Sequence, residues 1–167
     1  GISKDTEVSV NLSSQVDEFI DLVKGGEYLK AVEYYEGKLY GNYQYESEAS
    51  DGIEALLKNL NREILNGQKS ESDSKKITGA VDNVLSKTNI NIADYDVLKA
   101  NINGSIASKA AFLAGKELEG LEKYVDAIEE YAAVIESDSD YAEAKSAIDR
   151  CVQTAKKDVL ATAKAFV

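Results

Sequence analysis

YVDAIEEYAAVIESDSDYAEAKSAIDRCV, residues 124–152, contains two runs of apolar residues at helical spacing, one on each side of a polar turn. Apolar side chains recur every three or four positions in both runs, at Tyr124, Ala127, Ile128, Tyr131, Val134 and Ile135, then at Ala144, Ala147, Ile148, Cys151 and Val152. Such spacing places them on one face of a helix. The polar residues 137–140 between the runs suit a turn. The segment therefore predicts an antiparallel helical hairpin.

A second hairpin is predicted near the N-terminus. Its first helix has an apolar stripe, with Ser13 or Ser14 available as the N-cap, and the stripe consists of Val16, Phe19, Ile20 and Val23. Gly25 and Gly26 end this helix. The next helix begins at once, with apolar residues at Tyr28, Ala31, Val32 and Tyr35.

The middle of the chain repeats the helical spacing. The clearest stripe consists of Ile53, Leu56, Leu57, Leu60 and Ile64, and further stripes fall in residues 77–85 and 92–118. Gly104 either kinks one long helix or separates two, since glycine costs only about 1 kcal/mol in a helix. Proline is absent and no alternating strand pattern appears. The fold class is therefore predicted to be all-α, with about six or seven helices in stacked antiparallel hairpins.

Length and composition predict one domain over residues 1–167. Residues 1–11 precede the first apolar stripe and are predicted to be flexible. Residues 67–74 contain Ser, Lys and Asp but no apolar side chain, which predicts a mobile loop. The chain starts at Gly1 and contains no methionine, so we interpret it as a domain excised from a longer protein.

The net charge of −11 makes nucleic acid an improbable partner, because an acidic surface repels phosphates. Ten acids and one lysine lie between Glu117 and Glu143, whereas the segment from Ala144 to Val167 has five bases and two acids. Two interpretations follow. The acidic stretch pairs with the basic last helix, or it provides a docking surface for a basic peptide.

Residue types for most catalytic sites are missing. The chain has no histidine, which excludes Ser-His-Asp and Cys-His nucleophiles and histidine metal sites. Cys151 is the only cysteine and lies among apolar residues, so it is predicted to be a buried, inert thiol. We predict no enzymatic activity, no cofactor and no metal. No segment reaches the roughly 20 apolar residues of a membrane span, so this segment is not expected to insert into a membrane.

The candidate binding site is a group of tyrosines around the link after the N-terminal hairpin. Exposed tyrosines interspersed with amides can form an amphipathic contact patch for a peptide or a sugar. The predicted contact residues are Tyr34, Tyr40, Asn42, Tyr43, Gln44 and Tyr45. The alternative is that these side chains cover the end of the hairpin stack.

Two segments resemble tetratricopeptide repeats, whose units of about 34 residues are helix pairs with a glycine, alanine and aromatic pattern. Residues 12–45 supply Gly26, Tyr28, Ala31 and Tyr35 at the family offsets, and residues 108–141 supply Gly115, Tyr124, Ala127 and Tyr131. The resemblance implies a right-handed array of stacked hairpins that binds protein or peptide on an extended surface.

The chain departs from the family pattern at several positions. Ser139 stands at the family's proline position, Glu122 at the glycine before the second helix, and Phe19 where a small residue is expected. Tyr28 and Tyr124 are 96 residues apart, which is not a multiple of the repeat length.

The predicted function is a non-catalytic protein or peptide interaction module. The alternative is a ligand- or glycan-binding domain of a surface-anchored bacterial protein, which would recognise its ligand with the tyrosine patch. The partner is expected to be a protein or peptide. The localisation favoured is an extracytoplasmic domain of a bacterial surface or membrane-anchored protein.

Overall fold

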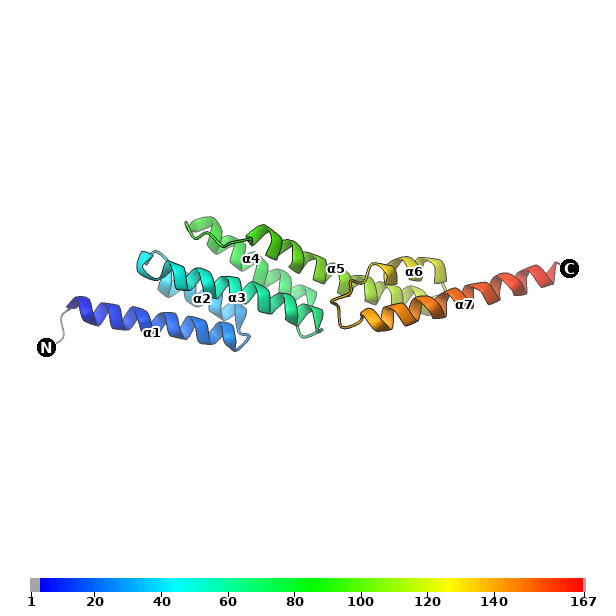
Figure 1. Ribbon diagram of the computed structural model, residues 1–167, viewed down its shortest axis with the longest axis horizontal. Coiled ribbons are helices and arrows are strands. Elements are labelled where there is room, and N and C mark those ends of the chain that lie inside the picture. Colours follow the sequence, from blue (N-terminus) through cyan, green and yellow to red (C-terminus); the bar gives the residue numbers. More distant parts are fainter. Residues whose placement is uncertain (1–3, 167) are drawn as a thin grey trace. The chain divides into compact units, whose positions relative to one another are not determined.

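The computed structural model describes the backbone of residues 4–166 and the side chains of residues 14–42 and 44–166. Within this range the chain is all-helical and contains no strand (Figure 1). Its seven α-helices are α1 (Lys4–Lys24), α2 (Tyr28–Tyr34), α3 (Glu46–Leu65), α4 (Glu71–Lys87), α5 (Tyr95–Gly120), α6 (Tyr124–Ala132) and α7 (Tyr141–Ala165). A π-helical turn (Tyr35–Leu39) and a 3₁₀ turn (Tyr43–Tyr45) lie between α2 and α3. The predicted fold class is therefore confirmed at the level of an all-α chain.

The chain forms two compact units, which are described separately. Unit 1 comprises Gly1–Glu63 and Lys69–Ile102, and unit 2 comprises Ile64–Gln68 and Asn103–Val167. The chain passes between the units near the end of α3, again between Gln68 and Lys69, and within α5. Each unit has buried apolar residues of its own.

In unit 1, α2 packs against both α1 and α4. Phe19 of α1 is fully buried, and its ring centroid lies 5.8 Å from that of Tyr35. Gly52 of α3 leaves room for this ring, since a Cβ atom added there would lie 2.5 Å from Phe19 Cε1. A large aromatic residue on one helix is thus accommodated by a glycine on another.

The predicted stripe of α3 faces the core. Each of its residues is at most 2% exposed, namely Ile53, Leu56, Leu57, Leu60 and Ile64. Long periodic stripes of this kind have to be buried, because helical propensity alone does not hold a short helix together in water.

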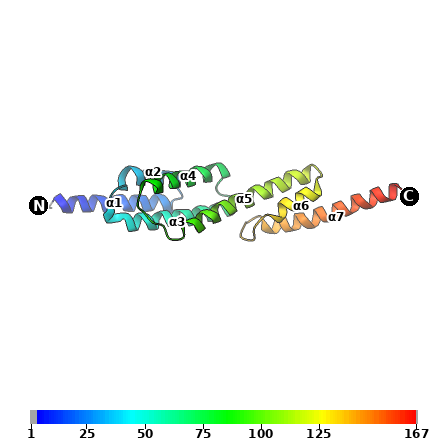
Figure 2. The same ribbon diagram turned by 90° about the horizontal axis from the view of Figure 1, so that it is seen from above.

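In unit 2, α6 and α7 lie side by side and pack extensively (Figure 1, Figure 2). Their contact is lined by Ala127, Tyr131, Ala144, Ala147 and Cys151, all nearly inaccessible to solvent. Small side chains on α7 allow close approach of the two helices. The hairpin predicted from residues 124–152 is therefore present.

The second half of α5 completes the core of unit 2. The ring centroids of Phe112 and Tyr131 are 5.9 Å apart. Gly115 faces the same tyrosine, since a Cβ atom added there would lie 2.7 Å from Tyr131 Cδ1. Gly104 lies inside a continuous α5, which resolves the open question of whether it breaks the helix.

Several predicted boundaries are wrong. The sequence predicts a helix capped at Ser13 or Ser14 after flexible residues 1–11, but α1 begins at Lys4, and residues 1–3 lie outside the described residues. The loop predicted over residues 67–74 ends at Ser70, because the Ser70 hydroxyl accepts a hydrogen bond from the Asp73 amide (3.0 Å) and starts α4 at Glu71. The stripe predicted over residues 92–118 begins before its helix, because α5 starts at Tyr95 after a left-handed turn at Asp94 (φ 57°).

Candidate functional site

The predicted site around Tyr34 and Tyr40–Tyr45 lies in unit 1, in the link between α2 and α3. The π-helical turn is followed by Gly41, whose φ of +85° suits glycine, and then by the 3₁₀ turn. These turns give the link a folded backbone.

Two tyrosine hydroxyls of the site bind other parts of unit 1. The Tyr34 hydroxyl donates to Glu18 Oε2 (3.1 Å) on α1. The Tyr40 hydroxyl donates to the backbone oxygen of Lys87 (2.8 Å), which lies in the last turn of α4. The last carbonyls of a helix have no partner within the helix, so Tyr40 satisfies one of them. An ion pair between Lys87 Nζ and Glu36 Oε1 (2.9 Å) joins the same two segments.

The remaining predicted residues differ in their surroundings. The Asn42 side chain donates to the backbone oxygens of Lys38 and Leu39, both at 3.4 Å. Gln44 is exposed, and the half-buried Tyr45 also takes part in an interaction within the structure. The Tyr43 side chain lies outside the described residues. The tyrosine hydroxyls thus hold the link against α1 and α4. Its role in partner binding stays a prediction.

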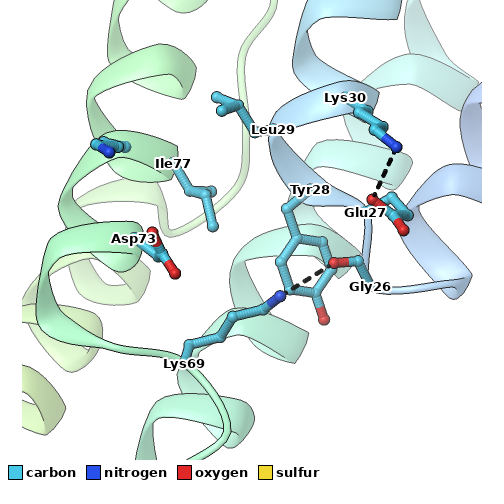
Figure 3. Close-up of a pocket in the computed structure, with 9 residues that line it drawn as sticks. Gly26, Glu27, Tyr28, Leu29, Lys30, Lys69, Asp73 and Ile77 are labelled. Atoms are coloured by element: carbon cyan, nitrogen blue, oxygen red, sulfur yellow. Dashed lines mark hydrogen bonds and ion pairs between the residues drawn. The ribbon is translucent and has the colours of Figure 1, made fainter.

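A pocket of about 280 Å³ lies in unit 1 between the start of α2 and the first turns of α4 (Figure 3). Lys69 points into it, donates to the Gly26 carbonyl oxygen (3.3 Å) and lies 5.2 Å from the centre of the Tyr28 ring. Lys30 pairs with Glu27 at 3.6 Å. Leu29 and Ile77 form the apolar wall. Since acids and bases both line the pocket, its charges favour no single sign of ligand.

The buried part of this region holds Tyr28 and Glu63. Burial raises the pKa of the Tyr28 hydroxyl, and a hydrogen bond to Glu63 raises it further. The second carboxylate oxygen of Glu63 is buried and has no hydrogen-bond partner among the described residues. The Tyr28 hydroxyl therefore stays protonated at neutral pH.

A second cavity, of about 460 Å³, is a groove in unit 2 between α6 and α7. We call it the α6–α7 groove, and it is lined by Ile128, Val152, Ala155, Lys156, Val159 and Leu160. Val159 is 68% exposed and Leu160 is 59% exposed. The groove lies beside α6, which has 9 residues whereas α7 has 25, so α7 extends past its neighbour and leaves part of its apolar face uncovered.

Sequence reasoning missed this groove. It assigned Val152 to the apolar face of the predicted hairpin and identified no exposed apolar surface on the last helix. The available signal was the length difference between the two predicted helices, since the longer one cannot bury its whole stripe against the shorter one.

Two polar clusters in unit 2 hold helices together. The buried Asp138 carboxylate binds Lys109 Nζ (2.6 Å) and the Ser108 hydroxyl (2.6 Å). Burial alone would raise the pKa of Asp138, but the hydrogen bonds from Lys109 and Ser108 outweigh it and lower the pKa. This cluster connects α5 to the turn before α7.

Glu119 of α5 forms the second cluster. Its carboxylate accepts hydrogen bonds from Arg150 Nη2 (2.7 Å) on α7 and from the Tyr131 hydroxyl (2.8 Å) on α6. The bonds from Arg150 are the largest cause of a Glu119 pKa lowered to about 2. Burial raises the pKa of the neighbouring Cys151 thiol, which is fully inaccessible, as predicted for an inert cysteine.

Within the described part of the chain, no group of three or more acidic or Cys side chains is arranged to hold a metal ion. No described helix is both long and apolar enough to cross a bilayer. Comparison with known proteins gives no match: no family model, no curated protein and no solved structure is similar to this chain.

Proposed function

We propose that this chain is a non-catalytic module that binds a protein or a peptide. The observation that supports the proposal is the α6–α7 groove, an elongated apolar surface left open on a folded helical hairpin. Full burial of a Val or Leu side chain is worth about 1.5–3 kcal/mol, so covering Val159 and Leu160 would contribute usefully to binding.

The lining of the groove favours a polypeptide over a small polar ligand. Lys156 is its only charged lining residue, and the other lining side chains are Ile, Val, Ala and Leu. Small polar ligands are oriented by several converging donors and acceptors, which this lining does not offer. An amphipathic segment needs only an apolar surface for its apolar face.

The resemblance to tetratricopeptide repeats supports the same proposal. Gly115 and Tyr131, two residues that the resemblance singles out, lie in direct contact. In an array of stacked hairpins, binding uses extended helical surface. Glycan binding through the tyrosine link has less support, because the hydroxyls of Tyr34 and Tyr40 are bonded within unit 1.

The test compares three forms of the full chain: wild type, Leu160→Glu in the groove, and Leu113→Glu on α5. Leu113 is 65% exposed and Leu160 is 59% exposed, so the two substitutions are matched in exposure. Each form is immobilised and used to capture proteins from a lysate of the source organism. The same forms are applied to a glycan array.

We expect wild type and Leu113→Glu to retain a saturable protein partner that Leu160→Glu loses by about tenfold or more. Binding only to glycans, unaffected by Leu160→Glu, would contradict the proposal. Capture that is equal for all three forms would contradict the assignment to the groove.

A further inference from the structure

The C-terminal half of α7 has a charge opposite to that of the chain. Residues 152–166 contain three lysines (Lys156, Lys157 and Lys164) and a single acid, Asp158. The chain as a whole has 30 acids and 19 bases. The apolar surface of the groove therefore lies on a locally basic helix.

These lysines are not neutralised by the fold. None of the three has an ion pair or a hydrogen bond with another described residue. Arg150, one turn earlier on the same helix, is by contrast fully engaged by Glu119. Lys156 lines the groove, and unpaired cations on its α7 side attract a partner that brings carboxylates to that edge. The α6 side differs, because α6 contains Asp126, Glu129 and Glu130 and no base.

The groove is shallow, and its apolar lining suits one face of a helix. Its walls are side chains of two neighbouring helices, Ile128 on α6 and Val152, Val159 and Leu160 on α7. From residue 152 to residue 160 a helix rises about 12 Å, or roughly two turns. A third helix can place side chains spaced three and four residues apart along this length.

Two other occupants fit less well. A second copy of the chain would bring a net charge of −11 toward another −11, which opposes association at low salt. An anionic membrane would be attracted by the lysines but repelled by the rest of the chain.

We propose that the α6–α7 groove binds an amphipathic helix whose apolar stripe has Asp or Glu side chains along the edge that faces the lysines of α7. The lysines of α7 select the acidic flank, and the groove receives the stripe. This inference rests on the proposed function and specifies the chemistry of the partner.

The test uses two synthetic helical peptides with the same apolar stripe and one uncharged edge, labelled for fluorescence anisotropy. The other edge of the stripe carries Glu in one peptide and Lys in the other. A scrambled Glu peptide of the same composition controls for charge alone. The full chain is titrated as wild type, as Leu160→Glu and as the double variant Lys156→Glu/Lys164→Glu. Vesicles containing anionic lipid and sedimentation equilibrium of the free chain test the other two occupants.

We expect the Glu peptide to bind wild type about tenfold more tightly than the Lys peptide or the scrambled peptide, with affinity falling as salt is added. The double variant should reverse the preference, and Leu160→Glu should abolish binding of both peptides. Circular dichroism of each variant confirms that it is folded.

Three results would overturn the inference. In the first, wild type binds both peptides equally or prefers the Lys peptide. In the second, wild type binds the vesicles and the double variant does not, and in the third, wild type dimerises and Leu160→Glu does not. Failure of the inference is distinguishable from failure of the proposed function. If lysate capture depends on Leu160 but not on the lysines, the proposed function stands and the acidic helix is ruled out.

Discussion

At the scale of single residues, two glycines of α5 have opposite surroundings. Gly115 faces the Tyr131 ring, and a Cβ atom there would lie 2.7 Å from the ring, whereas nothing lies within 4 Å of a Cβ atom at Gly104. We expect Gly115→Ala to lower the free energy of unfolding by about 2 kcal/mol, because overpacking outweighs the gain in helical propensity.

Gly104→Ala is the matched control on the same helix. It should raise the free energy of unfolding by about 0.5–1 kcal/mol, because alanine restricts the unfolded chain and meets no neighbour. Urea unfolding followed by circular dichroism measures both variants. Equal effects of the same sign would show that the contact between Gly115 and Tyr131 is not as close as described.

Glu119 predicts how stability depends on pH. Its pKa is lowered from the ordinary 4.5 to about 2, mainly by Arg150. A carboxyl with a lowered pKa stabilises the folded state at pH values above its unfolded pKa, and this stabilisation is lost as pH falls toward the folded pKa. Arg150 is more than half exposed, so solvent screening reduces the contribution to about 1–2 kcal/mol.

We therefore expect Glu119→Gln to lower the free energy of unfolding by about 1–2 kcal/mol at pH 7. The difference from wild type should shrink between pH 4.5 and pH 2. Glu117→Gln changes an exposed acid on the same helix and should have little effect. A difference that stayed constant down to pH 2 would show that the charge of Glu119 is not its source.

At the scale of elements, the start of α4 depends on Ser70. Its hydroxyl accepts a hydrogen bond from the Asp73 amide at 3.0 Å. We expect Ser70→Ala to lower the free energy of unfolding by about 1 kcal/mol, because an amide of the first turn loses its partner. Ser72→Ala, two residues later and exposed, should be neutral or slightly stabilising in the same denaturation measurement.

Which elements the sequence predicts depends on how long and regular the apolar stripe is. The stripe from Ile53 to Ile64 is unambiguous, and the structure buries it completely. The start of α5 was not predictable. The preceding turn depends on a left-handed backbone at Asp94, and the residue type alone does not predict that conformation. Val8 and Leu12 continue the four-residue spacing of Val16 toward the N-terminus, but Ser13 and Ser14 suggested an N-cap, so the start of α1 at Lys4 was missed.

The candidate site, too, could be predicted from the sequence only in part. Residue types in the tyrosine link suggested a contact patch, but the partner of the Tyr40 hydroxyl is a backbone oxygen of Lys87, 47 positions away in sequence. Pairings of that range follow from tertiary packing. The α6–α7 groove depends on where α6 ends, and helix ends are the least predictable part of a helix.

At the scale of the whole molecule, acids outnumber bases by 30 to 19. Most ion pairs among the described residues are exposed, such as Lys75 with Glu71, and pairs of this kind contribute little. Asp138 with Lys109 is buried and is only weakly screened by salt. Repulsion among unpaired acids should therefore be the larger salt-sensitive effect in the folded state.

This balance predicts that salt stabilises the protein at neutral pH. Between about 10 mM and 500 mM NaCl, where the screening length falls from roughly 30 Å to a few ångströms, we expect Tm to rise by several degrees. Near pH 4.5, the isoelectric point of the sequence, repulsion is largely cancelled and the same salt should leave Tm unchanged or lower it. Thermal melts followed by circular dichroism at both pH values provide the measurement. A Tm that falls with salt at pH 7 would mean that attractive ion pairs, and not repulsion among acids, dominate the electrostatics of the fold.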